Sequence, residues 1–271
     1  MSVDADIRDL NIAIPTLPAV IQELSNLLAN PAHQVSQVSA VIESDMGLAA
    51  AVLRVVNSSL FGLAGNVQTV LHALTYLGTH EVAAITLQMG LRAAFPRSPE
   101  LDALWERSAA RSRVMTQLGT ALRVDPWVAH AAGLFEECSK AILFRHAPDR
   151  YRAVLAAGQD DQALIFLEHR AFGVSHDLLG AAMCETWGLA PGAVRSVRHH
   201  VAAQAELQWP RNGPEHAITA LSVLAQAVGA EPKRLTQVAQ AVADQMAWPV
   251  ESVRSALQGT QPSRPRPASL A

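Results

Sequence analysis

The chain has 271 residues, of which 50% are hydrophobic, 17% are charged and 5% are aromatic. This length fits one large domain or two small ones, and the apolar half supplies enough side chains for a substantial core. The formal net charge of −3 provides no basic field of the kind that nucleic-acid binding usually needs. We therefore expect no direct binding to DNA or RNA.

Two features of the chain bear on its cellular compartment. Residues 1–10 are polar and acidic, which does not predict a signal peptide, and no apolar run approaches the roughly 20 residues of a membrane span. Cys138 and Cys184 are too few for a disulfide framework, and both lie in apolar helical patterns where we expect them to be buried. The expected compartment is the cytoplasm, without membrane contact.

The hydrophobic pattern predicts an all-α fold, because apolar residues recur at every third or fourth position and almost no strand pattern is present. Residues 1–13 are expected to be an N-terminal extension, and a proline-stiffened entry follows at 14–18. Asp45 is expected to cap a helix that ends near Asn57 and Ser58. The first half predicts helices over about 19–29, 35–42, 46–57 and 67–77, and a further one from 79.

The sequence Pro-Arg-Ser-Pro at 96–99 is the clearest internal break and predicts two packed helical lobes, 14–96 and 100–258, within one domain over 14–258. Asp125 and Pro126 start a helix whose apolar stripe is expected to continue through Ile142 until Pro148 ends it. The tail at 259–271 is proline-rich and is expected to be flexible. Other helices are predicted over about 101–123, 149–157, 160–171, 175–187 (capped by Ser175), 191–202, 214–228, 232–246 and 249–258.

Three blocks of this sequence resemble the HDOD family, which is named for an output domain related to the HD phosphohydrolases. The first block runs from Leu-Pro at 17–18 to Asp45, and continues with Leu-Arg-Val-Val-Asn-Ser-Ser-Leu-Phe at 53–61 and Ala-Leu-Thr-Tyr-Leu-Gly at 73–78. The second contains Leu-Trp-Glu-Arg-Ser at 104–108 and Gly-Leu at 133–134. The third contains Phe-Gly-Val-Ser-His-Asp-Leu-Leu-Gly at 172–180, Trp-Gly-Leu-Ala-Pro at 187–191 and Arg-His-His at 198–200. The resemblance spans about 14–229 and implies two helical lobes, the second like the HD helical bundle, and a role in bacterial signal transduction.

The ligand positions of an HD hydrolase are not matched in this chain. Such an enzyme needs a metal ion held by histidine and carboxylate ligands, with open positions for water and phosphate. The resemblance places the first histidine near Ser108, the His-Asp doublet at Glu136-Glu137 and the last aspartate near Leu221 and Ser222. It therefore implies a retained scaffold with a lost ligand set, and we expect no catalysis, metal or cofactor.

The acidic pair at the doublet position allows two interpretations. On a continuous helix, neighbouring residues point about 100° apart, so Glu136 and Glu137 would meet one ion only with favourable rotamers. We therefore expect one glutamate to be solvated and the other to cap the helix or to pair with Lys140, Arg145 or Arg170.

The alternative is a redesigned metal site in a divergent phosphohydrolase acting on a nucleotide or cyclic nucleotide. Its candidate ligands are Glu136, Glu137, His176, His199 and His200, because imidazole and carboxylate are the common ligands of borderline metals. These side chains would then have to converge on one point.

The sequence supports recognition better than catalysis. Asn57, Ser58, Trp187, His199 and His200 are the candidates for an interaction surface or for the groove between the lobes. Asn57 and Ser58 also suit a purely structural role at a helix end. The expected partners are other signalling proteins and a nucleotide second messenger, and the apolar helical surface would also suit a homodimer.

Overall fold

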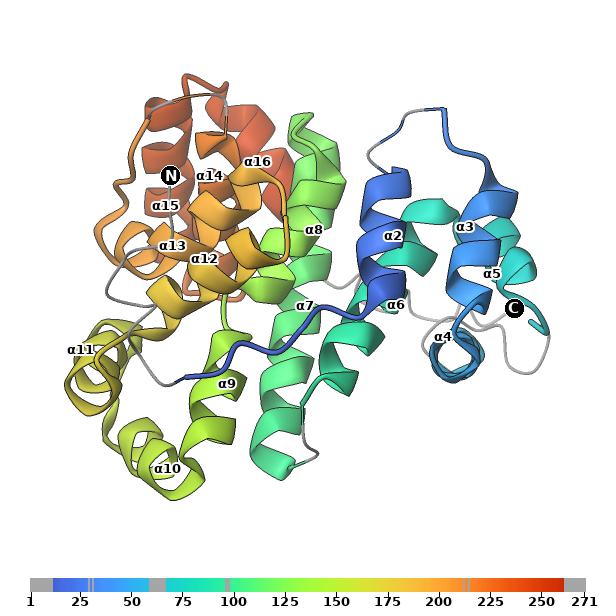
Figure 1. Ribbon diagram of the computed structural model, residues 1–271. Coiled ribbons are helices and arrows are strands. Elements are labelled where there is room, and N and C mark those ends of the chain that lie inside the picture. The colour runs from blue at the N-terminus through green and yellow to red at the C-terminus, as the bar shows by residue number, and fades with distance from the viewer. Residues whose placement is uncertain are drawn as a thin grey trace, which may run out of the picture.

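The computed structural model describes residues 12–260 apart from 29, 31, 59–66, 96–97, 212 and 214. Within that part all regular secondary structure is helical, which confirms the all-α prediction (Figure 1). Most of the predicted tail, residues 96–97 of the predicted break and most of the predicted N-terminal extension lie outside the described residues. The predicted start of the flexible tail at 259 is wrong, because Gly259 is the last residue of the helix Val250–Gly259 and Thr260 is buried. None of the described helices combines the length and apolar character needed to cross a bilayer.

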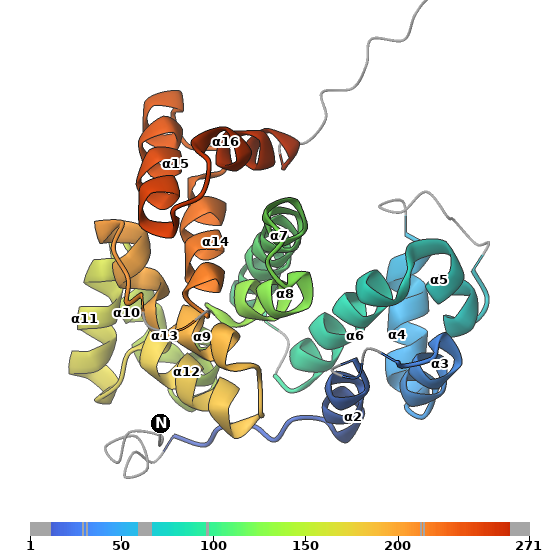
Figure 2. The ribbon, with the colours of Figure 1, turned by 90° about the horizontal axis from the view of Figure 1, so that it is seen from above.

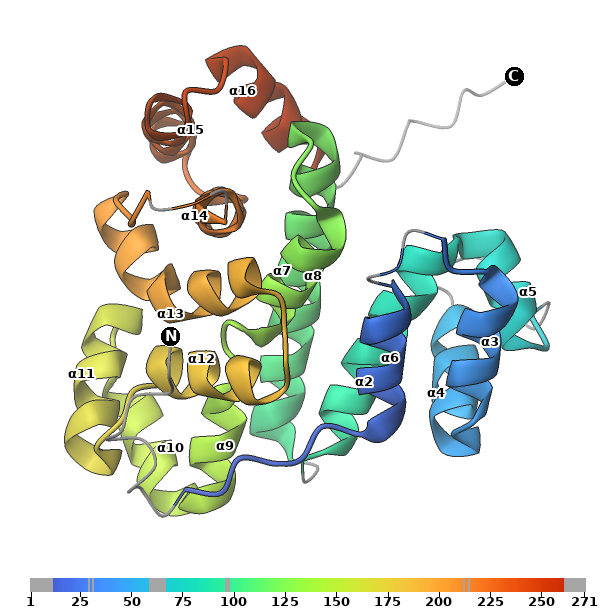
Figure 3. The same cartoon turned by 45° about the horizontal axis from the view of Figure 1, so that its top comes forward.

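The helices form two groups, which we call the N-terminal lobe and the C-terminal lobe; the two groups can be distinguished in all three ribbon views (Figures 1–3). The N-terminal lobe consists of α2 (Ala19–Leu28), α3 (Val35–Glu43), α4 (Met46–Val56), α5 (Val70–Leu77) and α6 (Thr79–Ala93). The C-terminal lobe consists of α7 (Pro99–Leu122), α8 (Pro126–Phe135), α9 (Ser139–His146), α10 (Pro148–Ala157), α11 (Asp161–Phe172), α12 (His176–Thr186), α13 (Pro191–Glu206), α14 (His216–Ala227), α15 (Pro232–Met246) and α16 (Val250–Gly259). The lobes meet where α6 packs against α8, as Figure 2 shows from above.

Side-chain caps set the start of several helices. The carboxylate of Asp45 accepts a hydrogen bond from the Leu48 amide at 2.9 Å, and that of Asp125 accepts from the Trp127 amide at 2.9 Å, as predicted. Ser175 departs from its prediction, because its hydroxyl donates to the Asp177 carboxylate instead of capping α12. The Leu178 amide, from which a capping serine would accept, donates to the Asp177 carboxylate at 2.9 Å.

An extended segment at 12–18 leaves the C-terminal lobe and leads into α2, and we call it the arm (Figure 3). The indole N–H of Trp187 donates to the Pro15 carbonyl at 2.8 Å. The guanidinium of Arg145 donates to the Ala13 carbonyl at 2.6 Å. The arm therefore ties the start of the N-terminal lobe to the C-terminal lobe.

The predicted helix from Asp125 to Pro148 is wrong in one respect, because it breaks into α8 and α9 at 136–138. In the break the Cys138 amide donates to the Phe135 carbonyl and the Lys140 amide donates to the Glu137 carbonyl, three residues back rather than four. The spacing of the apolar residues stays helical across the break, so the sequence pattern gives no sign of it. The break instead coincides with two buried charges, Glu136 and Glu137, whose partners lie on other helices.

Gly133 allows α8 to lie unusually close to α7. A Cβ atom at this position would lie 2.8 Å from the Ser112 Cα and 2.9 Å from the Met115 Sδ. These distances are shorter than the van der Waals contacts of a packed interior. The close approach brings the break at 136–138 against the middle of α7, where the polar site is built.

Candidate functional site

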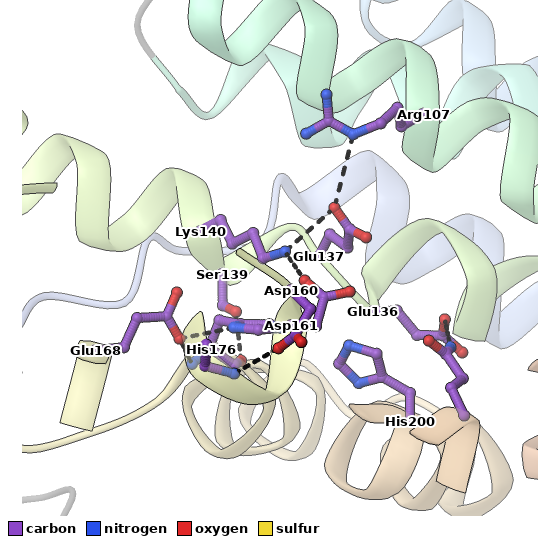
Figure 4. A network of polar contacts seen from close by, with 12 residues as sticks. Arg107, Glu136, Glu137, Ser139, Lys140, Asp160, Asp161, Glu168, His176 and His200 are labelled. Atoms are coloured by element: carbon purple, nitrogen blue, oxygen red, sulfur yellow. Dashed lines mark hydrogen bonds and ion pairs between the residues drawn. The ribbon is translucent and has the colours of Figure 1, made fainter. Parts of the chain in front are cut away.

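The most unusual feature of the C-terminal lobe is a network of buried charges around the break between α8 and α9 (Figure 4). Glu136 is fully buried and Glu137 is 8% exposed. Charged side chains are rarely buried unless they are paired. The expectation that one of the two glutamates is solvated is therefore wrong.

Glu136 is held by side chains from two helices, α7 and α13. Its Oε2 lies 2.7 Å from Arg111 Nη1 on α7 and 3.5 Å from Gln204 Nε2 on α13. Its Oε1 accepts a hydrogen bond from the Ser196 hydroxyl at 3.2 Å. Burial alone would lower the pKa of Arg111, but the carboxylates of Glu136 and Glu137 outweigh it and raise that pKa, so the guanidinium stays charged.

Glu137 faces three cations. Its Oε1 lies 3.5 Å from Arg111 Nη2, and its Oε2 lies 3.4 Å from Lys140 Nζ and 3.9 Å from Arg107 Nε. Burial would raise the pKa of Glu137, but Lys140 and Arg111 together lower it to about 2. Lys140 also lies 3.0 Å from Asp161 Oδ1 at the start of α11, so the network extends to α11.

The pairing of the acidic residues was predicted in part. Lys140 is confirmed as a partner of Glu137, whereas Arg145 and Arg170 are not partners. Arg145 instead donates to the arm, and the Arg170 guanidinium lies 5.8 Å from the centroid of the Phe166 ring. The main partner, Arg111, comes from α7, and no sequence spacing links α7 to the acidic pair.

A second buried cluster lies beside the first and contains His176. Glu168 Oε2 accepts hydrogen bonds from the His176 amide at 2.7 Å and from its Nδ1 at 2.6 Å, while Glu168 Oε1 accepts from the Tyr151 hydroxyl at 2.6 Å. Because a carboxylate only accepts, the Nδ1 atom of His176 carries a proton. The Nε2 atom is buried and has no hydrogen-bond partner among the described residues.

His200 repeats this arrangement on α13. Its Nδ1 donates to the Val197 carbonyl at 2.7 Å, and its Nε2 is buried and without a partner in the described part of the chain. The His176 and His200 ring centroids lie 5.4 Å apart (Figure 4). Burial lowers the pKa of His200, so this imidazole is neutral near pH 7.

The two serines at the expected ligand positions provide no carboxylate or imidazole that could bind a metal ion. Ser108 is buried on α7 and its hydroxyl has no partner among the described residues. Ser222 is buried on α14 and its hydroxyl accepts a hydrogen bond from Gln204 Nε2 at 2.9 Å. Through Gln204, Ser222 therefore joins the Glu136 network as a neutral member.

The residues of this site do not fit a divalent cation. Three of the four oxygens of the acidic pair face a guanidinium or ammonium group, and the fourth accepts from Ser196. A metal ion would have to displace these cations or lie against them. Within the described ranges no three His, Cys, Asp or Glu side chains are grouped as metal ligands.

The five candidate metal ligands are therefore only partly brought together. Glu136, Glu137, His176 and His200 belong to neighbouring parts of one buried region, but they do not form a ligand set. His199 is half-buried on α13 and takes no part in the hydrogen bonds of this region.

The other candidate surface residues have structural contacts. Asn57 donates to the Leu53 carbonyl at 3.0 Å and to the Val67 carbonyl at 2.8 Å, and it accepts from the Val67 amide at 3.1 Å. It joins the end of α4 to the residue at which the described chain resumes, within the N-terminal lobe. Ser58 is half-buried beside it. Trp187 holds the arm and packs edge-on against Phe135 at 5.6 Å.

Both cysteines are buried, as expected. Burial raises the pKa of the Cys138 thiol and that of the Cys184 thiol, so neither is a reactive thiolate near neutral pH.

Comparison with known proteins places this geometry in a family. The HDOD domain family model matches residues 14–203. A protein of Treponema pallidum (strain Nichols), described as uncharacterized, is 24% identical over 201 residues, which is 72% of this chain and 39% of that protein. The chain thus spans about two fifths of the length of this curated relative.

Solved structures share the fold at low sequence identity. A protein of Marinobacter aquaeolei VT8, provisionally described as a signal transduction protein, has a TM-score of 0.75 at 22% identity, over 96% of this chain and 64% of its own. An HDOD domain protein of unknown function from Geobacter sulfurreducens has a TM-score of 0.72 at 17% identity, over 94% and 91% of the two chains. A protein of Shewanella amazonensis SB2B, provisionally described as a phosphohydrolase, has a TM-score of 0.71 at 19% identity, over 96% and 95%. With the family model matching most of its length, the chain belongs to the HDOD domain family.

Proposed function

We propose that this HDOD protein is a non-catalytic regulatory module that acts through binding in bacterial signal transduction, in the cytoplasm. Its partner would be another signalling protein or a small nucleotide. One observation carries the proposal: Arg111 and Lys140 occupy the charge-balancing role at Glu136 and Glu137 that a metal ion has in a hydrolase.

Electrostatics explains why this arrangement opposes metal-dependent hydrolysis. A hard cation binds where carboxylates have no other positive partner, and it then activates water and neutralises phosphate. Here the carboxylates are already neutralised by side chains that cannot activate water. Arg111 is only 14% exposed and Lys140 is 7% exposed, so solvent screening does not weaken their repulsion of a further cation.

One observation favours the divergent phosphohydrolase as a second candidate. His176 and His200 each donate from Nδ1 to a fixed acceptor and leave a buried Nε2 without a partner. Metal-binding histidines are commonly oriented in this way. Two histidines without a free carboxylate are, however, too few for a catalytic centre of the usual kind.

Metal analysis and turnover assays distinguish the two candidates. The purified protein would be analysed for Mg, Mn, Fe, Zn, Co and Ni, and assayed with each divalent ion for hydrolysis of nucleotides, cyclic dinucleotides and (p)ppGpp. We expect less than stoichiometric metal and no turnover above a blank. Stoichiometric metal with turnover that Glu137→Gln abolishes and the exposed control Glu206→Gln retains would overturn the proposal.

A further inference from the structure

A cavity of about 330 Å³ lies beside the buried network, between α11, α13, α14 and α15. Figure 3 shows α11 and α15 on opposite sides of α13, with α14 beside them. Part of its wall is apolar and includes the buried side chains of Val201, Val223 and Val238. The volume is at the lower end of the range for small-molecule sites, which combine apolar walls with a few polar groups.

The polar groups of the cavity divide into acceptors and donors. Asp160 and Asp161, at the start of α11, provide carboxylate oxygens. Arg234, at the start of α15, provides a guanidinium. Gln226 on α14 lines the same cavity and uses its Oε1 to accept from Arg111 Nη2 at 2.5 Å, so its Nε2 remains available as a donor.

Gln204 supplies a side-chain amide to the wall of the cavity. It lines the cavity and is only 9% exposed. Its Nε2 donates to the Ser222 hydroxyl at 2.9 Å and lies 3.5 Å from Glu136 Oε2. Because a carboxylate can only accept, the amide atom that faces Glu136 must be the nitrogen, and the other amide atom of Gln204 is the acceptor Oε1. No hydrogen bond among the described residues uses this Oε1, so it is available as an acceptor at the wall of the cavity.

We propose that this cavity binds a small zwitterion of the amino-acid type, with an ammonium group, an aliphatic frame and a carboxylate. The ammonium group would donate to Gln204 Oε1 and to the carboxylates of α11. The carboxylate would accept from Arg234 and Gln226 Nε2, and the aliphatic frame would contact the valines. This inference rests on the proposed regulatory function and supplies a ligand for it.

The charges of the cavity favour a zwitterion over a nucleotide. Phosphates carry two or more negative charges and are recognised by clusters of arginine, lysine and backbone amides. The cavity lining contains one guanidinium and two carboxylates. A cyclic dinucleotide is also larger than a cavity of this volume, whereas a free amino acid fits within it.

Binding at this place would reach the buried network directly. Asp161 is the partner of Lys140, and Gln226 is the partner of Arg111. A ligand ammonium group would compete with Lys140 for Asp161, and a ligand carboxylate would compete with Gln226 for Arg111. The ligand would therefore redistribute the contacts of the cations that hold α7, α9, α11 and α14 together, which is how a ligand shifts a conformational equilibrium.

Titration calorimetry and thermal shift on the full chain test the inference. The probes are the twenty proteinogenic amino acids and γ-aminobutyrate, with 5′-AMP and cyclic di-GMP as the nucleotide arm. For any amino acid that binds, two analogues would then be tested: the amine that lacks the carboxylate and the carboxylic acid that lacks the amine. Arg234→Gln and Asp160→Asn each remove one charge from an exposed lining residue, and we call them the wall variants. Asparagine at position 160 can still accept from the Ala163 amide and cap α11. Lys233→Gln and Asp149→Asn are charge-matched controls at exposed positions outside the lining.

We expect at least one amino acid to bind, with an affinity loss of about tenfold or more in each wall variant and no loss in the controls. The single-charge analogues should bind more weakly than the zwitterion. Absence of binding by every amino acid, binding of a nucleotide in the cavity instead, or binding unaffected by both wall variants would each overturn the inference. Metal-dependent turnover would overturn the proposed function, whereas these three results leave that function standing.

Discussion

Arg111 Nη1 lies 2.7 Å from Glu136 Oε2, and this carboxylate is completely excluded from solvent. The two residues come from α7 and from the break between α8 and α9, 25 residues apart. A buried ion pair does not by itself imply high stability, because desolvating both charges is costly. Removing one partner is nevertheless severe, since it leaves the other charge buried and alone.

Arg111→Ala is therefore expected to destabilise the protein by about 3–5 kcal/mol, because two buried carboxylates lose their shared partner. Denaturant unfolding followed by circular dichroism would measure the free energy of unfolding. Arg254→Ala is the control, because its partner Glu251 is 79% exposed and the expected loss is below about 1 kcal/mol. Equal losses in both variants would contradict the role given to Arg111.

Trp187→Phe is expected to cost about 1 kcal/mol, because phenylalanine keeps the ring contact with Phe135 but loses the hydrogen bond to Pro15. Limited proteolysis should then cut the arm faster than in the parent protein. Trp209→Phe is the matched control, because its buried indole nitrogen has no partner among the described residues. We expect that change to be neutral or stabilising, and a larger loss at Trp209 than at Trp187 would be inconsistent with the contacts of the arm.

Gly133→Ala is expected to destabilise the protein by about 1–3 kcal/mol, because its Cβ would lie 2.8 Å from the backbone of α7 at Ser112. Thermal unfolding would detect this as a lower midpoint. Gly259→Ala provides the comparison, since no atom lies within 4 Å of its Cβ and alanine favours the helix. A Gly133→Ala protein as stable as the Gly259→Ala protein would show that α7 and α8 separate easily.

The pH dependence of stability should contain a contribution from His130 on α8. This side chain is 5% exposed, and burial lowers its pKa from 6.5 to about 4. The unfolded chain takes up a proton near pH 6.5, whereas the folded protein takes it up only near pH 4. The contribution is therefore fully present above pH 6.5 and is lost as the pH falls to 4, by up to about 3 kcal/mol.

His130→Gln removes the titrating group and should flatten the free energy of unfolding between pH 6.5 and 4. Glu137 acts in a separate window, because its pKa is lowered to about 2 from an ordinary value of 4.5. Its contribution is present above pH 4.5 and is lost as the pH falls toward 2. An unchanged slope between pH 6.5 and 4 in His130→Gln would contradict the assigned protonation state.

The helical fold could be predicted because local signals decide it. Asp45, Asp125 and Pro126 mark helix starts through backbone chemistry that does not depend on distant residues. The break at 136–138 could not be predicted, because the apolar stripe continues through it. It depends on ion pairs with α7, whose position is fixed by packing rather than by sequence spacing.

The candidate site could be predicted only in part. Glu136, Glu137, His176 and His200 do lie in one region, since the resemblance preserves their positions. Arg111 was missed because a lone arginine in a long helix carries no local signal. Glu168 was missed for the same reason, although the spacing of eight residues to His176 crosses the turn that brings the two together.

The arm also sets an order of events during synthesis. Its anchor, Trp187, lies 172 residues after the carbonyl that it binds. Trp187 and the helices before it must leave the ribosome before this bond can form, so the arm stays without this contact until then. The nascent polypeptide therefore completes the attachment of the arm only after Trp187 has been translated.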